Sequence, residues 1–314
     1  MKLARPDVFH PRIVLAGCAA LPEGEGDGDD AGLLMALRNR GLHARWLPWD
    51  DPATLDADLV VLRATWDYTE RLDEFLTWTR SVSHLINSAR IVEWNTDKRY
   101  LDDLHRIGVP VVPTGYFAVG DKVSVPDGEV VVKPAVGAGS TGAQRFVDAA
   151  EALAHAAALH ANGRAVLVQP YDPRIADGET ALVFLGGQES HAFTKGPILP
   201  PAGQSPEFEE TGTYAHESLS PADPDDEVWE VGRLAVDAVI RMFDLEPEDL
   251  VYARVDVIGG PEDPRLLELE LVEPGLGFRQ LDQTARERAE RRFAVGVEGA
   301  LERFGLGPLS HRGF

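Results

Sequence analysis

The chain has 314 residues, 44% of them hydrophobic and 26% charged, an ordinary composition for a globular protein with a large core. Its formal net charge of −22 argues against general binding to nucleic acid or to an anionic membrane, since both require a basic surface. A single cysteine excludes an intramolecular disulfide, and no segment reaches the ~18 apolar residues of a transmembrane helix. We expect a cytoplasmic protein whose partners are small molecules, and the sequence also allows a homodimer.

The first 115 residues alternate short apolar runs with helical patterns. Strands are predicted at 12–18, 43–48, 58–63 and 90–94. Helices are predicted at 29–41, 70–86 and 96–107. Such alternation is typical of a mostly parallel sheet covered by helices. The acidic, glycine-rich stretch at 23–30 is predicted to be a loop.

From residue 130 onwards the pattern changes. Strands are predicted at 129–135, 144–147, 164–171, 180–187, 190–195, 250–258 and 265–272. Helices are predicted at 148–161, 224–243 and 279–304, and an irregular loop at 196–219. Short turns between the later strands favour antiparallel pairing. We therefore predict an α/β protein with an amino-terminal domain at 1–115, a small α+β unit at 116–175 and a third unit at 176–314 that completes a cleft.

A glycine-rich loop, KPAVGAGSTG, runs from Lys133 to Gly142. Gly139 and Gly142 allow the backbone to approach an anion, and Ser140 and Thr141 add hydroxyl donors for phosphate oxygens. The loop lacks the residue order of a P-loop, and a strand follows it, so a flexible turn is the alternative. Lys133 favours phosphate binding, because the chain has only five lysines and the end of an apolar strand suits a solvated lysine poorly.

Two predicted strands near the carboxyl end, VYARVDVI and LLELELVE, carry alternating charges. Arg254 and Asp256 share one face of the first strand, and Glu268 and Glu270 share one face of the second. A hairpin in an even register would place Asp256 beside Glu268 and Arg254 beside Glu270. This excess of carboxylates favours Mg²⁺ held together with nucleotide phosphates. The alternative is a solvated sheet face with one cross-strand ion pair, worth about 0.2–1 kcal/mol.

As an ordered set, these motifs resemble the ATP-grasp superfamily. The matching pieces are NTDKRYL at 95–101, VVVKPAVGAGSTG at 130–142, VLVQPY at 166–171, GETALVF at 178–184, and YARVDVI with LLELELVEP between 252 and 274. RATWDY at 63–68 and SHAFTK at 190–195 are most similar to one branch. That branch contains glutathione-synthetase-like ligases and the O-ureido-serine cyclo-ligase that closes the ring of D-cycloserine.

The resemblance implies an ATP-grasp fold, in which a parallel-sheet domain is followed by two α+β subdomains that grip ATP. It implies an ATP-dependent carboxylate–amine ligase, or a cyclo-ligase, that uses ATP and Mg²⁺. The residues assigned to ATP are Lys98, Lys133, Gly139, Ser140, Thr141, Gly142, Gln169, Pro170, Tyr171, Glu179 and Lys195. Among them, the two lysines Lys98 and Lys133 would hold the phosphates from opposite sides. The hinge at 169–171 would meet the adenine, and Glu179 would bind the ribose.

The resemblance also assigns the metal ligands and the catalytic cations. The carboxylates assigned to Mg²⁺ are Asp256, Glu268, Glu270 and Glu273. Many relatives carry Glu-x-Asn where this chain has Glu268-Leu-Glu270, so the choice among the three glutamates stays open. Arg254 and Lys133 would act in catalysis, with Arg254 stabilising charge on the transferring phosphoryl group. A non-catalytic ATP-binding module and a small-molecule kinase are the alternative functions on this fold.

The substrate side is predicted from Arg63, which ends an apolar strand. In open α/β sheets, ligands bind beyond the carboxyl ends of the strands. Arg63 is therefore a candidate for binding a substrate carboxylate, with Trp66, Asp67 and Tyr68 shaping the pocket. The alternative is an ion pair between Arg63 and an acidic neighbour such as Asp67. Further candidates to face the cleft are Arg279 and Gln280.

Overall fold

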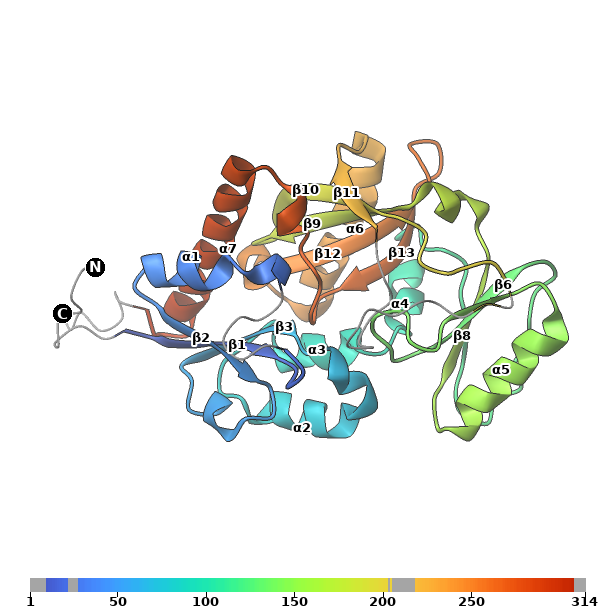
Figure 1. The fold of residues 1–314 in the computed structure, drawn as a ribbon, viewed down its shortest axis with the longest axis horizontal. Helices are drawn as coiled ribbons and strands as arrows, with labels where there is room; N and C mark the ends of the chain where they lie inside the picture. Colours follow the sequence, from blue (N-terminus) through green and yellow to red (C-terminus); the bar gives the residue numbers. More distant parts are fainter. Residues whose placement is uncertain (1–9, 22–27, 203, 205–217, 308–314) are drawn as a thin grey trace.

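The computed structural model describes residues 10–21, 28–202, 204 and 218–307, which form three sheets (Figure 1). The amino-terminal sheet has the strand order β2-β1-β3-β4, and every neighbouring pair is parallel. Its strands are β1 (Arg12–Gly17), β2 (His43–Pro48), β3 (Leu59–Ala64) and β4 (Leu85–Ile86). The two central strands, β1 and β3, are almost completely buried, as expected for a parallel sheet that is covered on both faces.

Helices cover both faces of this sheet (Figure 1). They are α1 (Leu33–Asn39) and α7 (Gln283–Arg303) on one face, and α2 (Leu72–Ser81) and α3 (Ala89–Asn95) on the other. Alternate residues of β1 divide between the two layers: Ile13 packs with α1 and α7, and Val14 packs with α2 and α3. The predicted α/β class is confirmed.

The strand predicted at 90–94 is wrong, because this segment forms helix α3. The helix buries Ile91, Val92 and Asn95 on one side. A short apolar run does not distinguish a buried strand from a buried helix. The parallel neighbour of β3 is instead the two-residue β4, which lies inside the helix predicted at 70–86.

The second sheet is antiparallel and has the order β5-β8-β6-β7. Its strands are β5 (Gly115–Phe117), β6 (Val130–Pro134), β7 (Gln144–Phe146) and β8 (Val166–Pro170). Helix α5 (Ala149–Ala161) packs on one face, and the Asp148 carboxylate caps its amino end by accepting from two backbone N–H groups. The glycine-rich loop therefore connects β6 to β7 as the tip of a hairpin.

The third sheet is antiparallel, with the order β11-β10-β9-β12-β13. Its strands are β9 (Glu179–Leu185), β10 (Gln188–Lys195), β11 (Leu219–Ala222), β12 (Tyr252–Ile258) and β13 (Arg265–Glu270). Strand β11 begins at the last residue of the loop predicted at 196–219; residues 203 and 205–217 of that loop lie outside the described residues. Its Pro221 is tolerated because β11 is an edge strand.

One face of this third sheet packs against α6 (Asp226–Phe243) and α4 (Tyr100–Arg106). On the opposite face, the apolar end of β9 and β12 packs against α7 through residues such as Val183 and Tyr252. The other end of that face carries the charged residues of the site. No helix among the described residues is long and apolar enough to cross a membrane. The domain boundaries at 115 and 175 stay a prediction.

Candidate active site

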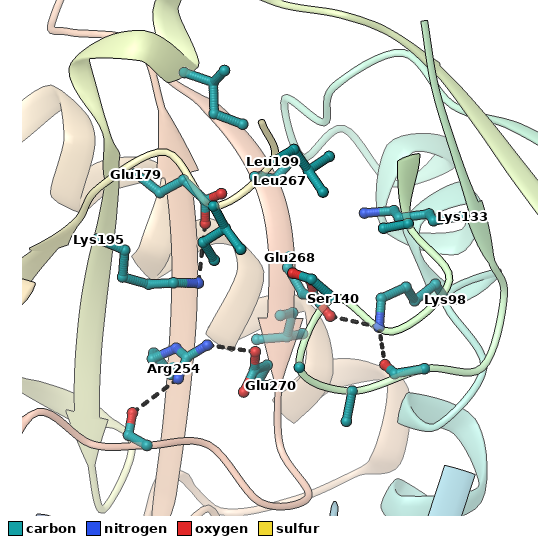
Figure 2. A pocket seen from close by; sticks show the side chains of 18 of the residues that line it. Lys98, Lys133, Ser140, Glu179, Lys195, Leu199, Arg254, Leu267, Glu268 and Glu270 are labelled. Atoms are coloured by element: carbon teal, nitrogen blue, oxygen red, sulfur yellow. Dashed lines mark hydrogen bonds and ion pairs between the residues drawn. The ribbon is translucent and has the colours of Figure 1, made fainter. Parts of the chain in front are cut away.

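A cleft of about 550 Å³ lies where the glycine-rich loop, the end of β8 and the charged face of the third sheet meet. Most of the predicted site residues line it. They are Trp66, Tyr68, Lys98, Lys133, Gly139, Ser140, Thr141, Gln169, Pro170, Tyr171, Glu179, Lys195, Arg254, Glu268, Glu270 and Glu273. Gly142, Asp256 and Arg63 do not line it. Figure 2 shows Glu179, Lys195 and Arg254 on one side and Lys98 and Lys133 on the other, with Glu268 and Glu270 between them.

Strands β12 and β13 pair in the predicted even register. Arg254 lies opposite Glu270, and Asp256 lies opposite Glu268, followed by a register shift after Asp256. Because cross-strand partners share a face, these four side chains and those of β9 and β10 form one charged surface. The predicted hairpin register is therefore confirmed.

Asp256 is fully buried at the centre of this surface. Its carboxylate accepts hydrogen bonds from Nε and Nη2 of Arg254, both at 2.9 Å, and from Nζ of Lys195 at 2.8 Å. Burial alone would raise the pKa of Asp256, but Arg254 and Lys195 outweigh it and hold that pKa below its usual range. Both carboxylate oxygens of Asp256 are thus occupied by protein cations.

The same two cations also reach the other carboxylates. Lys195 Nζ pairs with Glu179 Oε2 at 3.0 Å. Arg254 pairs with Glu270 and donates to the carbonyl of Gly275 at 3.0 Å. The guanidinium of Arg254 is therefore held between β12, β13 and the segment that follows β13, with little freedom to change its orientation.

Lys98 joins the glycine-rich loop to the carboxylate face. Its Nζ donates to the Gly137 carbonyl at 2.7 Å and pairs with Glu268 Oε1 at 2.6 Å. Its backbone N–H donates to the Ala135 carbonyl at 2.8 Å, which fixes the residue beside the loop. An ammonium in this position can exchange a carboxylate partner for a phosphate oxygen.

Lys133 enters the cleft from β6 and has no hydrogen-bond or ion-pair partner within the described part of the chain. Burial lowers the pKa of Lys133, and although Glu268 opposes this shift, the pKa stays below the usual value. A cationic side chain without a partner, directed into a cleft, is suited to an anionic ligand.

The glycine-rich loop turns through left-handed backbone conformations at Gly139, Ser140 and Gly142 (φ 57°, 62° and 77°). Ser140 is one of only two non-glycine residues in the described ranges with positive φ. Successive backbone N–H groups in such turns form concave anion sites. The backbone of the loop therefore has a conformation that could bind an anion, and its role in binding phosphate stays a prediction.

The segment that leaves β8 forms the opposite wall of the cleft. Gln169 is buried, and its Nε2 donates to the Thr114 hydroxyl at 2.9 Å. The Tyr171 ring lies 3.5 Å from the Arg145 guanidinium, which stacks over it. The segment is thus rigid and presents its backbone at the edge of the cleft.

Two carboxylates, those of Glu268 and Glu270, are suited to Mg²⁺. No group of three or more His, Cys, Asp or Glu side chains in the described ranges could hold a metal ion alone. Mg²⁺ is commonly held by one or two carboxylates plus nucleotide phosphates, so a pair of glutamates fits this ion. Burial raises the pKa of Glu270 to about 7, and the charges of Asp256 and Glu268 add to this shift, although the paired Arg254 opposes it.

Glu273 follows the end of β13 and lies near the amino-terminal domain. It is 8% exposed, lines the cleft, and forms a side-chain hydrogen bond with Tyr68. Burial raises the pKa of Glu273 to about 8, and the charge of Glu270 adds to this shift. Unlike Glu268 and Glu270, it forms no ion pair with any residue of the described chain.

Arg63 is a correction to the sequence-based expectation, because it does not reach the cleft. It is 1% exposed, and its Nε and Nη2 donate to the two oxygens of Asp30 at 2.8 and 3.0 Å. Its Nη2 also donates to the Pro274 carbonyl at 2.8 Å. The alternative partner, Asp67, instead accepts from Trp49 Nε1 at 2.8 Å. Arg63 thus stabilises the segment after β13 through this buried hydrogen bond to its backbone.

Some cleft residues are not identifiable from the sequence. Asp29 lines the cleft near Trp66 and accepts a hydrogen bond from the backbone N–H of Arg279 at 2.9 Å. Asp29 lies in the acidic, glycine-rich stretch at 23–30, which the sequence predicts only to be a loop. Arg279 and Gln280 also line the cleft, as expected.

Together, a glycine-rich hairpin and a cation–carboxylate sheet face that enclose one cleft define an ATP-grasp ligase. The structure is similar to that of D-alanine–D-alanine ligase from Bacillus anthracis complexed with ATP (TM-score 0.62, 14% identity, 93% of this chain and 98% of that chain). It is also similar to a RimK domain ATP-grasp protein from Sphaerobacter thermophilus (TM-score 0.58, 17% identity, 91% and 99% of the two chains). At these identities, the likeness concerns the fold.

Closer similarity is found to D-cycloserine synthetase DcsG. Residues 13–87 match the family described as D-cycloserine synthetase DcsG, N-terminal domain. The chain is 37% identical to the cycloserine biosynthesis protein DcsG of Streptomyces lavendulae, over 88% of this chain and 95% of that protein. The crystal structure of D-cycloserine synthetase DcsG gives a TM-score of 0.78 at 34% identity, over 93% and 99% of the two chains. The chain belongs to the D-cycloserine synthetase family of ATP-grasp ligases.

Proposed function

We propose that this chain is an ATP- and Mg²⁺-dependent cyclo-ligase that closes the ring of D-cycloserine, with O-ureido-serine as the substrate. The observation that carries the proposal is the meeting of Lys98, Lys133 and Arg254 with the β13 glutamates in one cleft under the glycine-rich loop. Full-length similarity to DcsG supports the choice of substrate.

Lys98 and Lys133 approach the cleft from separate elements and would bind the phosphates of ATP between them. Backbone N–H groups around Ser140 would add donors to the phosphate oxygens. The hinge residues Gln169, Pro170 and Tyr171 would contact the adenine. Glu179 would face the ribose, with Lys195 holding its carboxylate in place.

Glu268 and Glu270 would hold Mg²⁺. When bound, the ion would neutralise charge on the phosphates and polarise the γ-phosphoryl group. Asp256 supports this site indirectly, because it holds Arg254 and Lys195 in fixed positions. The donor set fits the ion, since two glutamates on one sheet face leave further positions for phosphate and water.

The chain supplies no nucleophile in this reaction. A carboxylate oxygen of the substrate attacks the γ-phosphorus as the bond to the ADP oxygen breaks, and the ureido nitrogen bonded to oxygen then displaces phosphate from the acyl carbon. To give D-cycloserine, water must also cleave the bond between that nitrogen and its carbamoyl group, which leaves as carbon dioxide and ammonia. Arg254 is placed to stabilise the negative charge that develops in both steps, because it is oriented by Asp256, Glu270 and the Gly275 carbonyl. Positioning and electrostatic stabilisation account for catalysis.

The test is turnover with O-ureido-serine, ATP and Mg²⁺, measured as release of ADP and phosphate and by mass analysis of the product. Stoichiometric ADP, phosphate and a cyclised product are expected. Accumulation of a phosphorylated substrate would identify a kinase. Tight ATP binding without turnover of any amino-acid substrate would identify a binding module.

We also infer a cytoplasmic location, supported by the use of ATP. The absence of nucleic-acid and membrane partners is supported by the net charge of −22. A homodimer stays a prediction, as does the division of the chain at residues 115 and 175; sedimentation and limited proteolysis test these two points.

A further inference from the structure

We propose that Glu273, held by Tyr68, binds the protonated amino group of the substrate and is a specificity-determining residue, not a Mg²⁺ ligand. This inference rests on the proposed function, because it assigns a role within the same cleft. It also names the substrate class: acids that carry a free ammonium group.

The path of the chain separates Glu273 from the metal-binding face. Strand β13 ends at Glu270, and Leu271 still packs in the core of the third sheet. Val272, which continued alternation would place beside Glu268 and Glu270, instead packs in the core between the amino-terminal sheet, α2 and α3. The chain thus turns towards the amino-terminal domain, and Glu273 meets Tyr68 there.

Hydrogen bonds fix this turn. The Leu271 N–H donates to Asn95 Oδ1 at 2.7 Å, and the Leu271 carbonyl accepts from Asn87 Nδ2 at 2.8 Å. The Val272 carbonyl accepts from the Tyr252 hydroxyl at 2.9 Å. The backbone of both residues before Glu273 is therefore held in place, so the Cα of Glu273 cannot take the next position on the β13 face without breaking buried hydrogen bonds.

Charge distribution then favours a cationic ligand. The cations of the carboxylate face pair elsewhere: Lys98 with Glu268, and Arg254 with Asp256 and Glu270. Glu273 is more than nine-tenths buried, and its side chain forms a hydrogen bond with the neutral Tyr68 hydroxyl and no ion pair within the described chain. The charge of Lys98 lowers the pKa of Glu273, but the ammonium of Lys98 is itself paired with Glu268. A buried carboxylate without an ion-pair partner is costly, and a ligand ammonium would remove that cost.

The surroundings favour an ammonium over a metal ion. Trp66 and Tyr68 line the same end of the cleft, and aromatic rings attract organic cations. Asp29, which also lines the cleft, has one buried carboxylate oxygen without a hydrogen bond in the described structure and adds negative potential to the cleft. Mg²⁺ requires a near-octahedral set of oxygen ligands. One carboxylate beside aromatic side chains supplies too few of them.

The test compares Glu273→Gln with Glu262→Gln, a control at an exposed position in the β12–β13 turn. We would measure KM and kcat for O-ureido-serine, the Mg²⁺ concentration for half-maximal activity, and competitive inhibition by the analogue that lacks the amino group. Glu273→Gln should raise KM about tenfold or more and leave the Mg²⁺ requirement and the inhibition constant of the analogue unchanged. The control should match the wild type in every measurement.

Three outcomes overturn the inference: an unchanged KM, a shifted Mg²⁺ requirement, or equal loss of affinity for substrate and analogue. If Glu273→Gln does not fold, Tyr68→Phe provides the second variant, and its KM should change in the same direction by a smaller factor. Wild-type protein that turns over no amino-acid substrate refutes the proposed function itself. If the wild type turns over the substrate and the KM of Glu273→Gln equals that of the wild type, only the role of Glu273 is refuted.

Discussion

Lys98 and Glu268 come from opposite sides of the cleft, and Lys98 Nζ lies 2.6 Å from Glu268 Oε1. Lys98 precedes α4, whereas Glu268 lies on β13, so the pair links the glycine-rich loop to the carboxylate face. In the proposed reaction both partners have other ligands: phosphate for the lysine and Mg²⁺ for the glutamate. The pair therefore keeps the two charges in place until ATP separates them.

Lys98→Ala should raise KM for ATP by about tenfold or more, because it removes a charge-assisted contact to phosphate. Lys98→Arg should recover part of the loss, since a guanidinium also binds phosphate but with different geometry. Steady-state kinetics with varied ATP measures both. Wild-type KM in the alanine variant would contradict the assignment.

Lys133→Met should weaken ATP binding while raising the melting temperature of the free protein. The ammonium of Lys133 has no hydrogen-bond or ion-pair partner within the described chain, and burial lowers the pKa of Lys133, so removing the charge relieves a desolvation cost. Lys122→Met is the control, because Lys122 is exposed and far from the cleft lining. Calorimetry of the two variants, with and without ADP, separates the effect on nucleotide binding from the effect on the stability of the free protein. A melting temperature of free Lys133→Met below that of the wild type would contradict the prediction.

Asp256→Asn should reduce kcat by about a hundredfold or more and leave a folded protein. The change removes the charge that orients Arg254 and Lys195, and misplaced electrostatic groups lose this much catalysis. Stopped-time assays of ADP release and circular dichroism provide the two measurements. Near wild-type turnover would show that Asp256 has no part in the site.

Arg63→Met should destabilise the protein by about 3–5 kcal/mol, because it removes the guanidinium that pairs with the buried Asp30 carboxylate. The double variant Arg63→Met/Asp30→Leu should lose less than the sum of the two single changes. Urea unfolding measures each free energy. Additive losses would mean that the pair is not coupled as the structure shows.

The free energy of unfolding should decrease at acidic pH, in part because Asp58 becomes protonated. Its carboxylate accepts from the Arg12 backbone N–H at 2.8 Å and from Arg12 Nε at 3.2 Å. Burial raises the pKa of Asp58, but the bonds from Arg12 outweigh it, so the folded-state pKa lies below the ordinary value. The contribution is present above the unfolded-state pKa and is lost as pH falls through the folded-state pKa. The stability difference between wild type and Asp58→Asn should therefore shrink at low pH, as measured by urea unfolding at a series of pH values; a constant difference would contradict the prediction.

The pairing of β12 with β13 was predictable, because alternation of charge along two neighbouring strands admits few registers. The glycine-rich hairpin was predictable from its composition and from the strand patterns on each side. Helix α3 was not, since its apolar residues 91–92 fit a strand equally well until the packing of α2 against the sheet is known. The partner of Arg63 was not predictable either, because Asp30 is 33 residues away in the chain and no local sequence pattern links the two residues.

Local residue order was thus sufficient to predict the α/β class, the glycine-rich hairpin and the set of charged residues on one sheet face. Hydrophobic periodicity and turn preferences depend on residues close together in the chain, so the elements they produce can be predicted from the sequence. Which of those charges meet a ligand was decided by tertiary packing, which buries Arg63 against Asp30 and turns Glu273 away from Glu270 towards Tyr68. Burial and long-range pairing set the electrostatic state of each group, and both depend on segments that come together only when the sheets assemble.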